Sequence, residues 1–510
     1  MAQAVAPDDG MLTVSQNDFS GGMNTRRHAS RIAQNQAEDL TNADIGVAGE
    51  TRKRLGLTLI ENLEGTNGGT CAFGFEPDGG TNELLVTHDQ KLEGWTGSGT
   101  FTEHKTDFTT NLATTIIKAG ESGEGDVVLI SNGTDNVFRM LQAHTFQDCL
   151  DTNTSPPKTT VMTYFRNRVW ALKSNLLYFS DAYPADYSAA FDRTTDAFRV
   201  PIGTERSILG LRDAGMVMVG SEQIWGLNPS IIPDPTTDKP EKILDIGCVA
   251  NKTVCQVGDD VLFLASDGVR GVFRTQQDKL QLGQSFPLSY NLKTQFEDIN
   301  WSYITKACAI HFDNKYLLSL PTASSAYNNT VWIYYPALQA WTVIDGWNVS
   351  SFASLTVGGE ERLYATSATD GKVYRCLFGD NDNGTAITMT IIGREENYGQ
   401  PLVKKNGGEI EIEAEVAGSD NKFTLSVAQD GGSFQSLDDI SLDSETAPTL
   451  PIALPFALAD SYVVREKQSL DSLGAYRTIQ IKIENSDDNT DPIILYGYNL
   501  IAFKEEYENG

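Results

Sequence analysis

Short runs of apolar residues recur in pairs along the middle of the chain, and a polar turn separates the two members of each pair. A clear example is Val127–Ile130, which is followed by the polar run Ser131–Asn136 and then by Val137–Phe138. Runs of four to six β-branched and aromatic residues bounded by Gly, Asn, Asp or Ser are typical of strands, and two such runs across a turn form a β-hairpin. The pattern therefore predicts a series of hairpins.

The hairpins recur at a nearly constant interval. The first strand of each pair begins near residues 84, 127, 169, 216, 261, 316 and 363, so that neighbouring copies are 42 to 55 residues apart. An interval of about 40–50 residues with several strands in each unit is typical of the four-stranded blades of a β-propeller. The sequence therefore predicts an all-β protein with a propeller of six or seven blades; the alternative is a meander of hairpins in a sandwich.

The period ends after Cys376–Phe378, where the turn-forming run Gly379–Gly384 marks a domain boundary. Beyond it, Glu409–Val416 alternates carboxylates with apolar residues, as a half-buried antiparallel strand does. We therefore expect three parts: an N-terminal arm over residues 1–55, the propeller over 56–380, and a β-sandwich or propeller-closing β domain over 381–510. The proline-rich run Ala447–Pro455 is expected to be an extended surface segment, and the single helical pattern is Arg31–Leu40.

Charge narrows the classes of function. The 510 residues include 39 Lys and Arg against 68 Asp and Glu, which gives a net charge of −29. Such a surface does not favour binding to nucleic-acid phosphates. The first ten residues lack the pattern of a signal peptide, no apolar run reaches the length of a membrane span, and six scattered cysteines are too few for a disulfide scaffold. No membrane insertion is expected.

No motif for catalysis or metal binding stands out. The chain lacks a Gly-x-Ser-x-Gly elbow, a phosphate-binding loop and a His-Glu-x-x-His zinc motif. Its five histidines are scattered singly, and Asp380–Gly384 begins like a calcium loop but has Ile391 where the bidentate acid belongs. We therefore expect no catalytic residues, no metal site and no cofactor.

Three segments near the N-terminus carry a resemblance to a known family. They are Asp18–Asn24 (Asp-Phe-Ser-Gly-Gly-Met-Asn), Ala37–Asn42 (Ala-Glu-Asp-Leu-Thr-Asn) and Arg52–Gly56 (Arg-Lys-Arg-Leu-Gly). Together with Ser472–Ile483 and Pro492–Tyr498 near the C-terminus, they resemble the tail nozzle or tail tubular proteins of short-tailed (podovirus) double-stranded DNA bacteriophages.

The resemblance implies a structural protein of the virion tail, made in the host cytoplasm, and not an enzyme. It implies a homohexameric ring that docks below the portal–adaptor complex, binds tail fibres or a needle, and retains packaged DNA until the DNA passes through the lumen during ejection. An acidic wall fits such a conduit because it repels phosphates without reading their sequence.

Two sets of residues are the candidate sites. The flexible glycines and the cations of the N-terminal segment contrast with the acidic body, and they form a candidate docking arm: Phe19, Gly21, Gly22, Asn24, Arg26, Arg27, Arg31, Arg52, Lys53 and Arg54. Two long inserts between blade strands are candidate channel gates: Tyr183, Pro184 and Tyr187 in the first, and Pro229, Ile231, Ile232 and Pro233 in the second.

Two other functions stay open. A carbohydrate-binding or carbohydrate-cleaving propeller, either a depolymerase or an adhesin, would need acidic and aromatic side chains that converge in a pocket, and 68 acids form chance pairs too readily for the sequence to nominate any. The other is an intracellular propeller scaffold that binds peptides.

Overall fold

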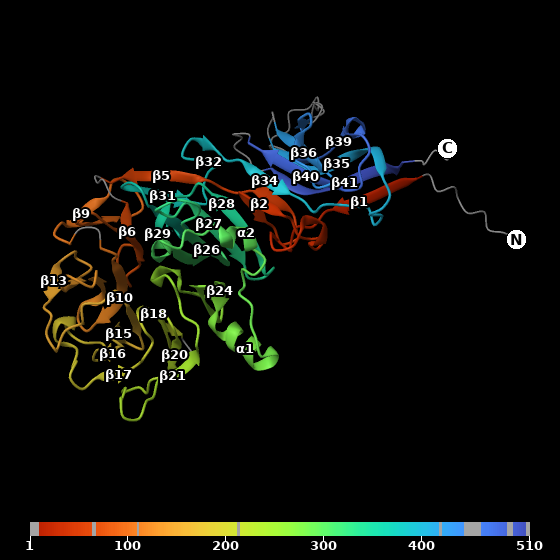
Figure 1. The fold of residues 1–510 in the computed structure, drawn as a ribbon. Coiled ribbons are helices and arrows are strands. Elements are labelled where there is room, and N and C mark those ends of the chain that lie inside the picture. The colour runs from red at the N-terminus through yellow and green to blue at the C-terminus, as the bar shows by residue number, and fades with distance from the viewer. Residues whose placement is uncertain are drawn as a thin grey trace.

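A computed structural model describes residues 10–63, 68–109, 112–211, 215–417, 421–442, 461–486 and 493–505. Short antiparallel strands dominate these ranges, as Figure 1 shows. The proline-rich segment 447–455 lies outside the described residues. No helix within the described ranges has the length and apolar character that a membrane crossing requires.

The described strands from Leu57 to Cys376 form a seven-bladed β-propeller, and we number the blades 1 to 7 in chain order. Six blades have four strands, and blade 5 has three followed by a helix. Blade 1 consists of β6 (Gly69–Phe75), β7 (Glu83–His88), β8 (Lys91–Trp95) and β9 (Thr102–Lys105), and blade 2 of β10 (Thr115–Glu121), β11 (Gly125–Ser131), β12 (Val137–Met140) and β13 (Phe146–Cys149). Blade 3 consists of β14 (Met162–Phe165), β15 (Arg168–Lys173), β16 (Leu176–Phe179) and β17 (Ala197–Arg199). Blade 4 consists of β18 (Glu205–Leu211), β19 (Gly215–Gly220), β20 (Ile224–Leu227) and β21 (Glu241–Leu244). Blade 5 has β22 (Cys255–Val257), β23 (Asp260–Ala265), β24 (Gly268–Gly271) and helix α1 (Val272–Leu282); blade 6 has β25 (Cys308–Phe312), β26 (Lys315–Leu320), β27 (Thr330–Tyr335) and β28 (Ala340–Asp345); and blade 7 has β29 (Val349–Val357), β30 (Glu360–Ser367), β31 (Lys372–Cys376) and β5 (Leu57–Asn62).

A strand from the N-terminal side of the propeller closes the ring. The first strands of successive blades are neighbours around the centre, and β29 of blade 7 adjoins β6 of blade 1. Blade 7 takes its outer strand, β5, from the chain that precedes blade 1, and β5 pairs with β31 in antiparallel register from Leu57 opposite Cys376 to Asn62 opposite Lys372. The first and last blades are therefore held together by backbone hydrogen bonds.

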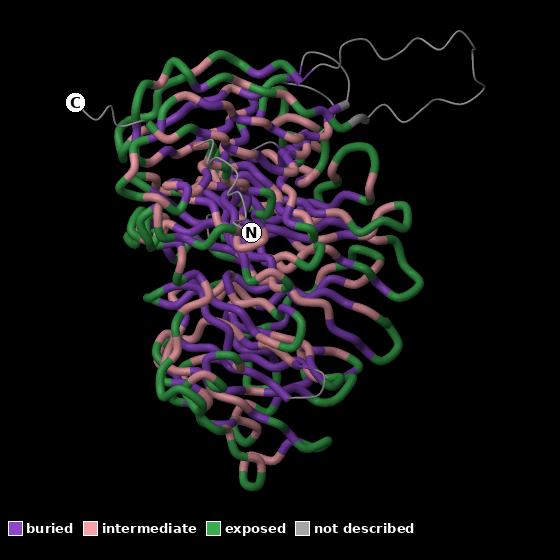
Figure 2. Tube along the Cα trace, turned by 90° about the vertical axis from the view of Figure 1, so that its right-hand side faces the viewer, coloured by how far each residue is buried: buried purple, intermediate pink, exposed green. Residues whose placement is uncertain are grey.

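The second strand of each blade is buried on both faces. On β7, Leu84 and Val86 pack toward blade 7, whereas Leu85 packs toward blade 2. The same division recurs on β11 of blade 2, where Val127 and Leu129 face blade 3, whereas Val128 and Ile130 face blade 1. Figure 2 shows the result, with buried segments inside and exposed segments at the turns. The second strand of a blade thus buries its apolar residues between the two neighbouring blades, as a propeller requires.

The two ends of the chain build a second β module beside the propeller, which we call the terminal module. It has two sheets that share one apolar cluster with blades 6 and 7. In the first sheet the strand order is β3 (Ala43–Ile45), β4 (Thr51–Lys53), β41 (Ile494–Lys504), β35 (Lys405–Ala417) and β39 (Ser461–Ser469), and β1 (Met11–Gln16) also pairs with β41. The second sheet continues blade 6 through β2 (Asp39–Thr41), β34 (Met389–Ile392), β40 (Ile479–Asn485), β36 (Lys422–Gln429) and the two-residue β37 (Gln435–Ser436). In Figure 1 the red strand β1 runs along the blue strand β41.

This arrangement corrects two expectations. The described part of residues 1–55 is not a separate arm that crosses a neighbouring surface, because β1 and β4 pair with β41 and β2 pairs with both β28 and β34. The sheets of the terminal module are therefore not made from residues 381–510 alone, and a C-terminal sandwich stays a prediction. The expected helix at Arg31–Leu40 is also wrong: only Ala29–Arg31 forms a 3-10 turn, because the apolar residues Ala37 and Leu40 serve a β bridge and strand β2 instead.

Candidate functional site

Asp18–Asn24, the first motif of the predicted docking arm, packs against blade 6. Phe19 is fully buried, Met23 donates its backbone N–H to the Trp341 carbonyl at 2.9 Å, and Asn24 donates its backbone N–H to the Ala37 carbonyl at 2.8 Å. Gly22 has a φ of +64° and lies directly over the backbone of Trp341. The motif therefore holds the terminal module to the propeller.

The cations of the predicted arm divide into two groups. Arg26, Arg27 and Arg31 are exposed, and the guanidinium of Arg26 lies 3.6 Å from the ring centroid of Tyr290. Lys53 and Arg54 are buried, whereas Gly21 is half-buried. Arg52 is also exposed, but it is paired with Asp44 at 2.7 Å. The docking role of the arm as a whole stays a prediction, and among the arm's described cations Arg26, Arg27 and Arg31 are the ones offered for contact with a partner.

Arg54 forms an internal ion pair and not a surface contact. Its guanidinium donates to Asp382 Oδ1 at 2.9 Å and Oδ2 at 2.6 Å, and its Nε donates to Asn42 Oδ1 at 2.8 Å. Trp347 stacks on the guanidinium at 4.9 Å and donates its indole N–H to Asp382 Oδ1 at 3.1 Å. The acidic turn that resembled a calcium loop thus supplies the carboxylate for this arginine.

A second charged group, centred on Asp44, joins β3 to blade 6. Lys315 Nζ lies 2.9 Å from Asp44 Oδ1, the Tyr335 hydroxyl donates to the same oxygen at 2.5 Å, and Arg52 donates to Oδ2 at 2.7 Å. Burial raises the pKa of Asp44, but Lys315 and these hydrogen bonds outweigh it and hold the pKa below its usual value of 3.8. A cleft of about 220 Å³ opens beside this group, and Arg362, Arg375 and Glu360 of blade 7 line its far side.

The Asp44 group makes stability depend on pH. We expect Asp44→Asn to lower the free energy of unfolding at pH 7 by about 1.5–3 kcal/mol, the range for hydrogen bonds to a charged group. A carboxyl whose folded pKa is depressed stabilises fully above its unfolded pKa of 3.8, and this contribution disappears as pH falls through the folded pKa. The difference in the free energy of unfolding between the unaltered chain and Asp44→Asn, measured by urea unfolding, should be smaller below pH 3.8 than at pH 7. The exposed Asp438→Asn variant is the control, and a difference that is independent of pH would contradict the assignment.

The two candidate gate loops lie on the outer part of their blades. The first connects β16 to β17 and the second connects β20 to β21, so that both join the third strand to the fourth. Tyr187 is fully buried and donates its hydroxyl to the Gly120 carbonyl at 3.0 Å, which assigns it a packing role between blades 2 and 3. Pro184, Pro229 and Pro233 are also buried, whereas Tyr183, Ile231 and Ile232 are exposed. Only these three side chains remain accessible to a lumen between subunits, and the gate role stays a prediction.

The centre of the propeller contains polar cavities. The larger has a volume of about 550 Å³, and its lining residues come from the first strand of several blades and the turns beside them, among them Thr70, Thr160, Arg206, Lys252, Lys306 and Asn328. A cavity of this size is within the range that small molecules occupy. The gate loops do not reach it, because neither is among its lining residues.

One group of side chains has the donor atoms to hold a metal ion. Glu83 of β7, His104 of β9 and His144 of the turn between β12 and β13 place one ligand atom each within 4.8 Å of one another. Burial raises the pKa of Glu83, but hydrogen bonds from the two imidazoles outweigh it and hold the pKa below 4.5. The sequence offered no signal for this group, because its members come from three separate strands and turns of two blades and the histidines are 40 residues apart.

Comparison with known proteins gives likeness of fold alone. No protein-family model matches the chain, and no curated protein matches it. Among solved structures, BBS1N, crystallised in complex with ARL6DN, is 13% identical with a TM-score of 0.40 and covers 64% of this chain and 96% of its own. The WD40 β-propeller domain of Doa1 is 10% identical with a TM-score of 0.37 over 63% of this chain and 96% of its own. PorZ, a surface component of the type-IX secretion system of Porphyromonas gingivalis, is 11% identical with a TM-score of 0.34 over 69% of this chain and 44% of its own.

Proposed function

We propose that this chain is a non-enzymatic structural protein of a bacteriophage tail, the nozzle of a short-tailed double-stranded DNA phage. Six copies form a ring below the portal–adaptor complex, the ring carries fibres or a needle, and DNA passes through its lumen without sequence-specific binding. The protein needs no cofactor for this role and acts in the virion tail after synthesis in the host cytoplasm.

The observation that carries the proposal is the way in which the two ends of the chain meet. The segments that resemble nozzle proteins lie at opposite ends of the sequence, and both contribute to the terminal module: β4 pairs with β41, and β2 pairs with β34, which pairs with β40. Segments that share a family pattern at both ends of a chain are expected to cooperate in one structural unit. Their position side by side supports the resemblance with information that the linear sequence did not contain.

The terminal module is joined to the propeller by backbone pairing, as a subunit of a ring that withstands the pressure of packaged DNA needs. Blade 6 continues into the module through the parallel pair of β2 and β28, and Asn42 donates its backbone N–H to the Val343 carbonyl at 2.7 Å. The exposed cations Arg26, Arg27 and Arg31 lie on the segment that joins β1 to β2. They offer positive charge on a chain with a net charge of −29, which suits contact with another acidic subunit.

The conduit in this proposal is the opening between subunits, not the centre of one propeller. A cavity of about 550 Å³ has the size of a small-molecule site and does not admit a DNA duplex. The net charge of −29 supports a lumen that repels phosphates and lets DNA slide.

The test is the solution mass of the purified full chain, measured by light scattering, with negative-stain images of the same sample. We expect a mass six times 55.7 kDa and a six-fold ring with a central hole. Replacing Arg27 and Arg31 by Glu should weaken ring formation or docking to the adaptor, whereas the exposed pair Lys239 and Lys279, replaced in the same way, should not. A chain that stays monomeric with and without the adaptor and that depolymerises capsular polysaccharide would favour the carbohydrate-active alternative instead.

A further inference from the structure

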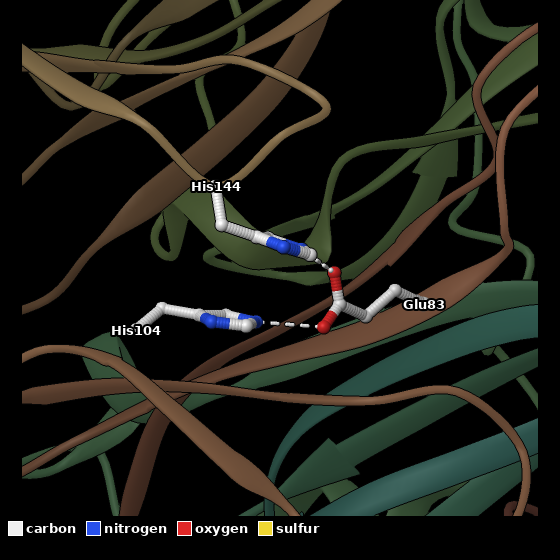
Figure 3. A group of neighbouring side chains, drawn as sticks. All are labelled: Glu83, His104 and His144. Atoms are coloured by element: carbon white, nitrogen blue, oxygen red, sulfur yellow. Dashed lines mark hydrogen bonds and ion pairs between the residues drawn. The ribbon is translucent and has the colours of Figure 1, made fainter.

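Three side chains from two blades converge at the boundary between blades 1 and 2. Glu83 begins β7, His104 lies on β9 of the same blade, and His144 lies in the turn between β12 and β13 of blade 2. Figure 3 shows the two imidazoles lying nearly parallel, each with a ring nitrogen directed at one oxygen of the same carboxylate. His104 Nε2 lies 2.7 Å from Glu83 Oε1, and His144 Nε2 lies 2.8 Å from Glu83 Oε2.

The spacing of the donor atoms is close to that of ligands around one ion. The ring centroids of the two histidines are 4.1 Å apart with an interplanar angle of 12°, and the three ligand atoms lie within 4.8 Å of one another. A zinc ion binds imidazole nitrogen at about 2.0–2.1 Å and carboxylate oxygen at about 2.0–2.2 Å in tetrahedral geometry, so two of its ligands lie about 3.4 Å apart. The two nitrogen–oxygen distances of 2.7 Å and 2.8 Å are those of hydrogen bonds, and they lengthen when the three side chains turn from these bonds to the ion.

Residue 94 of β8 faces this group and has no side chain that would occupy the space. A Cβ on Gly94 would lie 1.9 Å from Glu83 Oε1 and 2.4 Å from His104 Nε2. The φ of Gly94 lies outside the left-handed region, so that its backbone conformation does not require glycine. His144 in turn has a φ of +56° in the turn between β12 and β13, where it donates its backbone N–H to the Leu141 carbonyl, and its Nε2 lies 2.8 Å from Glu83 Oε2. Both features serve the convergence of the three side chains.

Burial and chemistry indicate the class of ion. The side chains of Glu83 and His104 are 4% and 6% exposed, while that of His144 is 41% exposed, so two ligands are held inside and the third lies at the surface. Two imidazoles and one carboxylate suit Zn²⁺ and neighbouring divalent transition metals, whereas Ca²⁺ and Mg²⁺ prefer oxygen ligands alone. Three protein ligands with one open side leave a fourth position to water.

We propose that Glu83, His104 and His144 bind one divalent transition-metal ion, with Zn²⁺ the best fit, and that the ion fastens blade 2 to blade 1. On binding, each imidazole turns its Nε2 lone pair to the metal and carries its proton on Nδ1. Because His144 belongs to blade 2 and the other two ligands to blade 1, the ion acts as a cross-link between neighbouring blades. The site is independent of ring assembly and of the proposed tail function.

The experiment is isothermal titration of the chelator-treated full chain with ZnCl₂, followed by Co²⁺ substitution to read the ligand set from the absorption spectrum. We expect one ion per chain and a Tm that rises with Zn²⁺ concentration, because the ion binds the folded state alone. Loss of a ligand in His144→Asn or Glu83→Gln should weaken binding by more than the about 10–100-fold that loss of an outer-shell partner costs. Asparagine is chosen at position 144 because it tolerates positive φ.

The matched control is His28→Ala, which removes an exposed histidine that lies 3.4 Å from Glu395. It should bind Zn²⁺ as the unaltered chain does. Near-UV circular dichroism of the two site variants without metal should match that of the unaltered chain, which excludes misfolding as the cause of lost binding. The proposal is overturned if the unaltered chain binds no Zn²⁺, or if His144→Asn and Glu83→Gln bind it with unchanged affinity.

Discussion

Replacing Arg54 by methionine should destabilise the protein by about 3–5 kcal/mol, the range for removing one partner of a buried ion pair. The substitution keeps most of the side chain's apolar length but leaves Asp382 without its bidentate partner. Asp382 then keeps the hydrogen bond from the Trp347 indole N–H. Asn42 Oδ1 also loses the hydrogen bond from Arg54 Nε and keeps the one from the Asp345 backbone N–H at 3.2 Å. The free energy of unfolding, measured by urea titration at pH 7 with circular dichroism, reports the loss.

Two neighbouring substitutions make this result specific. Arg52→Met removes an arginine two residues away whose side chain is 49% exposed, so its ion pair with Asp44 should contribute only about 1 kcal/mol or less. Arg54→Lys keeps the charge but cannot reproduce the bidentate pairing, so its effect should lie between the two. Equal losses in the free energy of unfolding for Arg52→Met and Arg54→Met would show that the buried ion pair of Arg54 and Asp382 stabilises the protein no more than the exposed one.

Gly22→Ala should destabilise the protein by about 2–5 kcal/mol, and it should loosen the contact between the terminal module and blade 6. Left-handed backbone costs a non-glycine residue about 1–2 kcal/mol, and overpacking adds about 1–3 kcal/mol. A Cβ on Gly22 would lie 2.7 Å from the backbone nitrogen of Trp341 and 2.8 Å from the Ala340 side chain. Hydrogen exchange of the amides of β28 and β2, together with the urea midpoint, measures both effects.

Gly79→Ala is the control for the strain that a non-glycine residue experiences in a left-handed backbone conformation. Gly79 has a φ of +72°, close to the +64° of Gly22, but a Cβ there meets nothing within 4 Å. Its replacement should therefore cost only the strain of the left-handed conformation, about 1–2 kcal/mol. If Gly22→Ala costs no more than Gly79→Ala, the close approach to Trp341 is not what requires glycine at position 22.

The N-terminal motifs have a structural role within this chain. Gly22 and Arg54 belong to the segments that carry the resemblance to nozzle proteins, and both act inside the chain: Gly22 against Trp341, and Arg54 on Asp382. The motifs therefore contribute to the junction between the terminal module and the propeller. Docking on a partner, if the proposed function holds, falls to the exposed arginines Arg26, Arg27 and Arg31.

The propeller could be predicted because its strongest sequence signal has a simple structural origin. Each of the seven positions from which the period was measured lies in the second strand of a blade, from β7 to β30. The middle of that strand is buried on both faces by the two neighbouring blades, so it carries consecutive apolar residues, as in Val127–Ile130. Strands nearer the outer edge are partly exposed, as Phe146–Cys149 shows, and their patterns are weak.

The parts that the sequence did not reveal all depend on contacts between distant segments. Strand β5 closes blade 7 through pairing with β31 more than 300 residues away, and nothing in Leu57–Asn62 indicates which strand it joins. The segment Arg31–Leu40 has helical spacing, but the backbone of Ala37 and Leu40 pairs with Met23 and with Ile391 instead. Tertiary pairing overrides a local preference that is worth only a few tenths of a kcal/mol per residue.

The sequence by itself determined that the chain is an all-β protein with a repeated unit, because burial between identical neighbours places apolar residues at a regular interval. It also determined the net charge of −29, which disfavours a surface that binds nucleic-acid phosphates. Only the tertiary structure decided that there are seven blades, that the two ends form one module, and that Glu83, His104 and His144 meet. The physical reason is that ring closure and side-chain convergence depend on distances in space, which a linear order of residues does not fix.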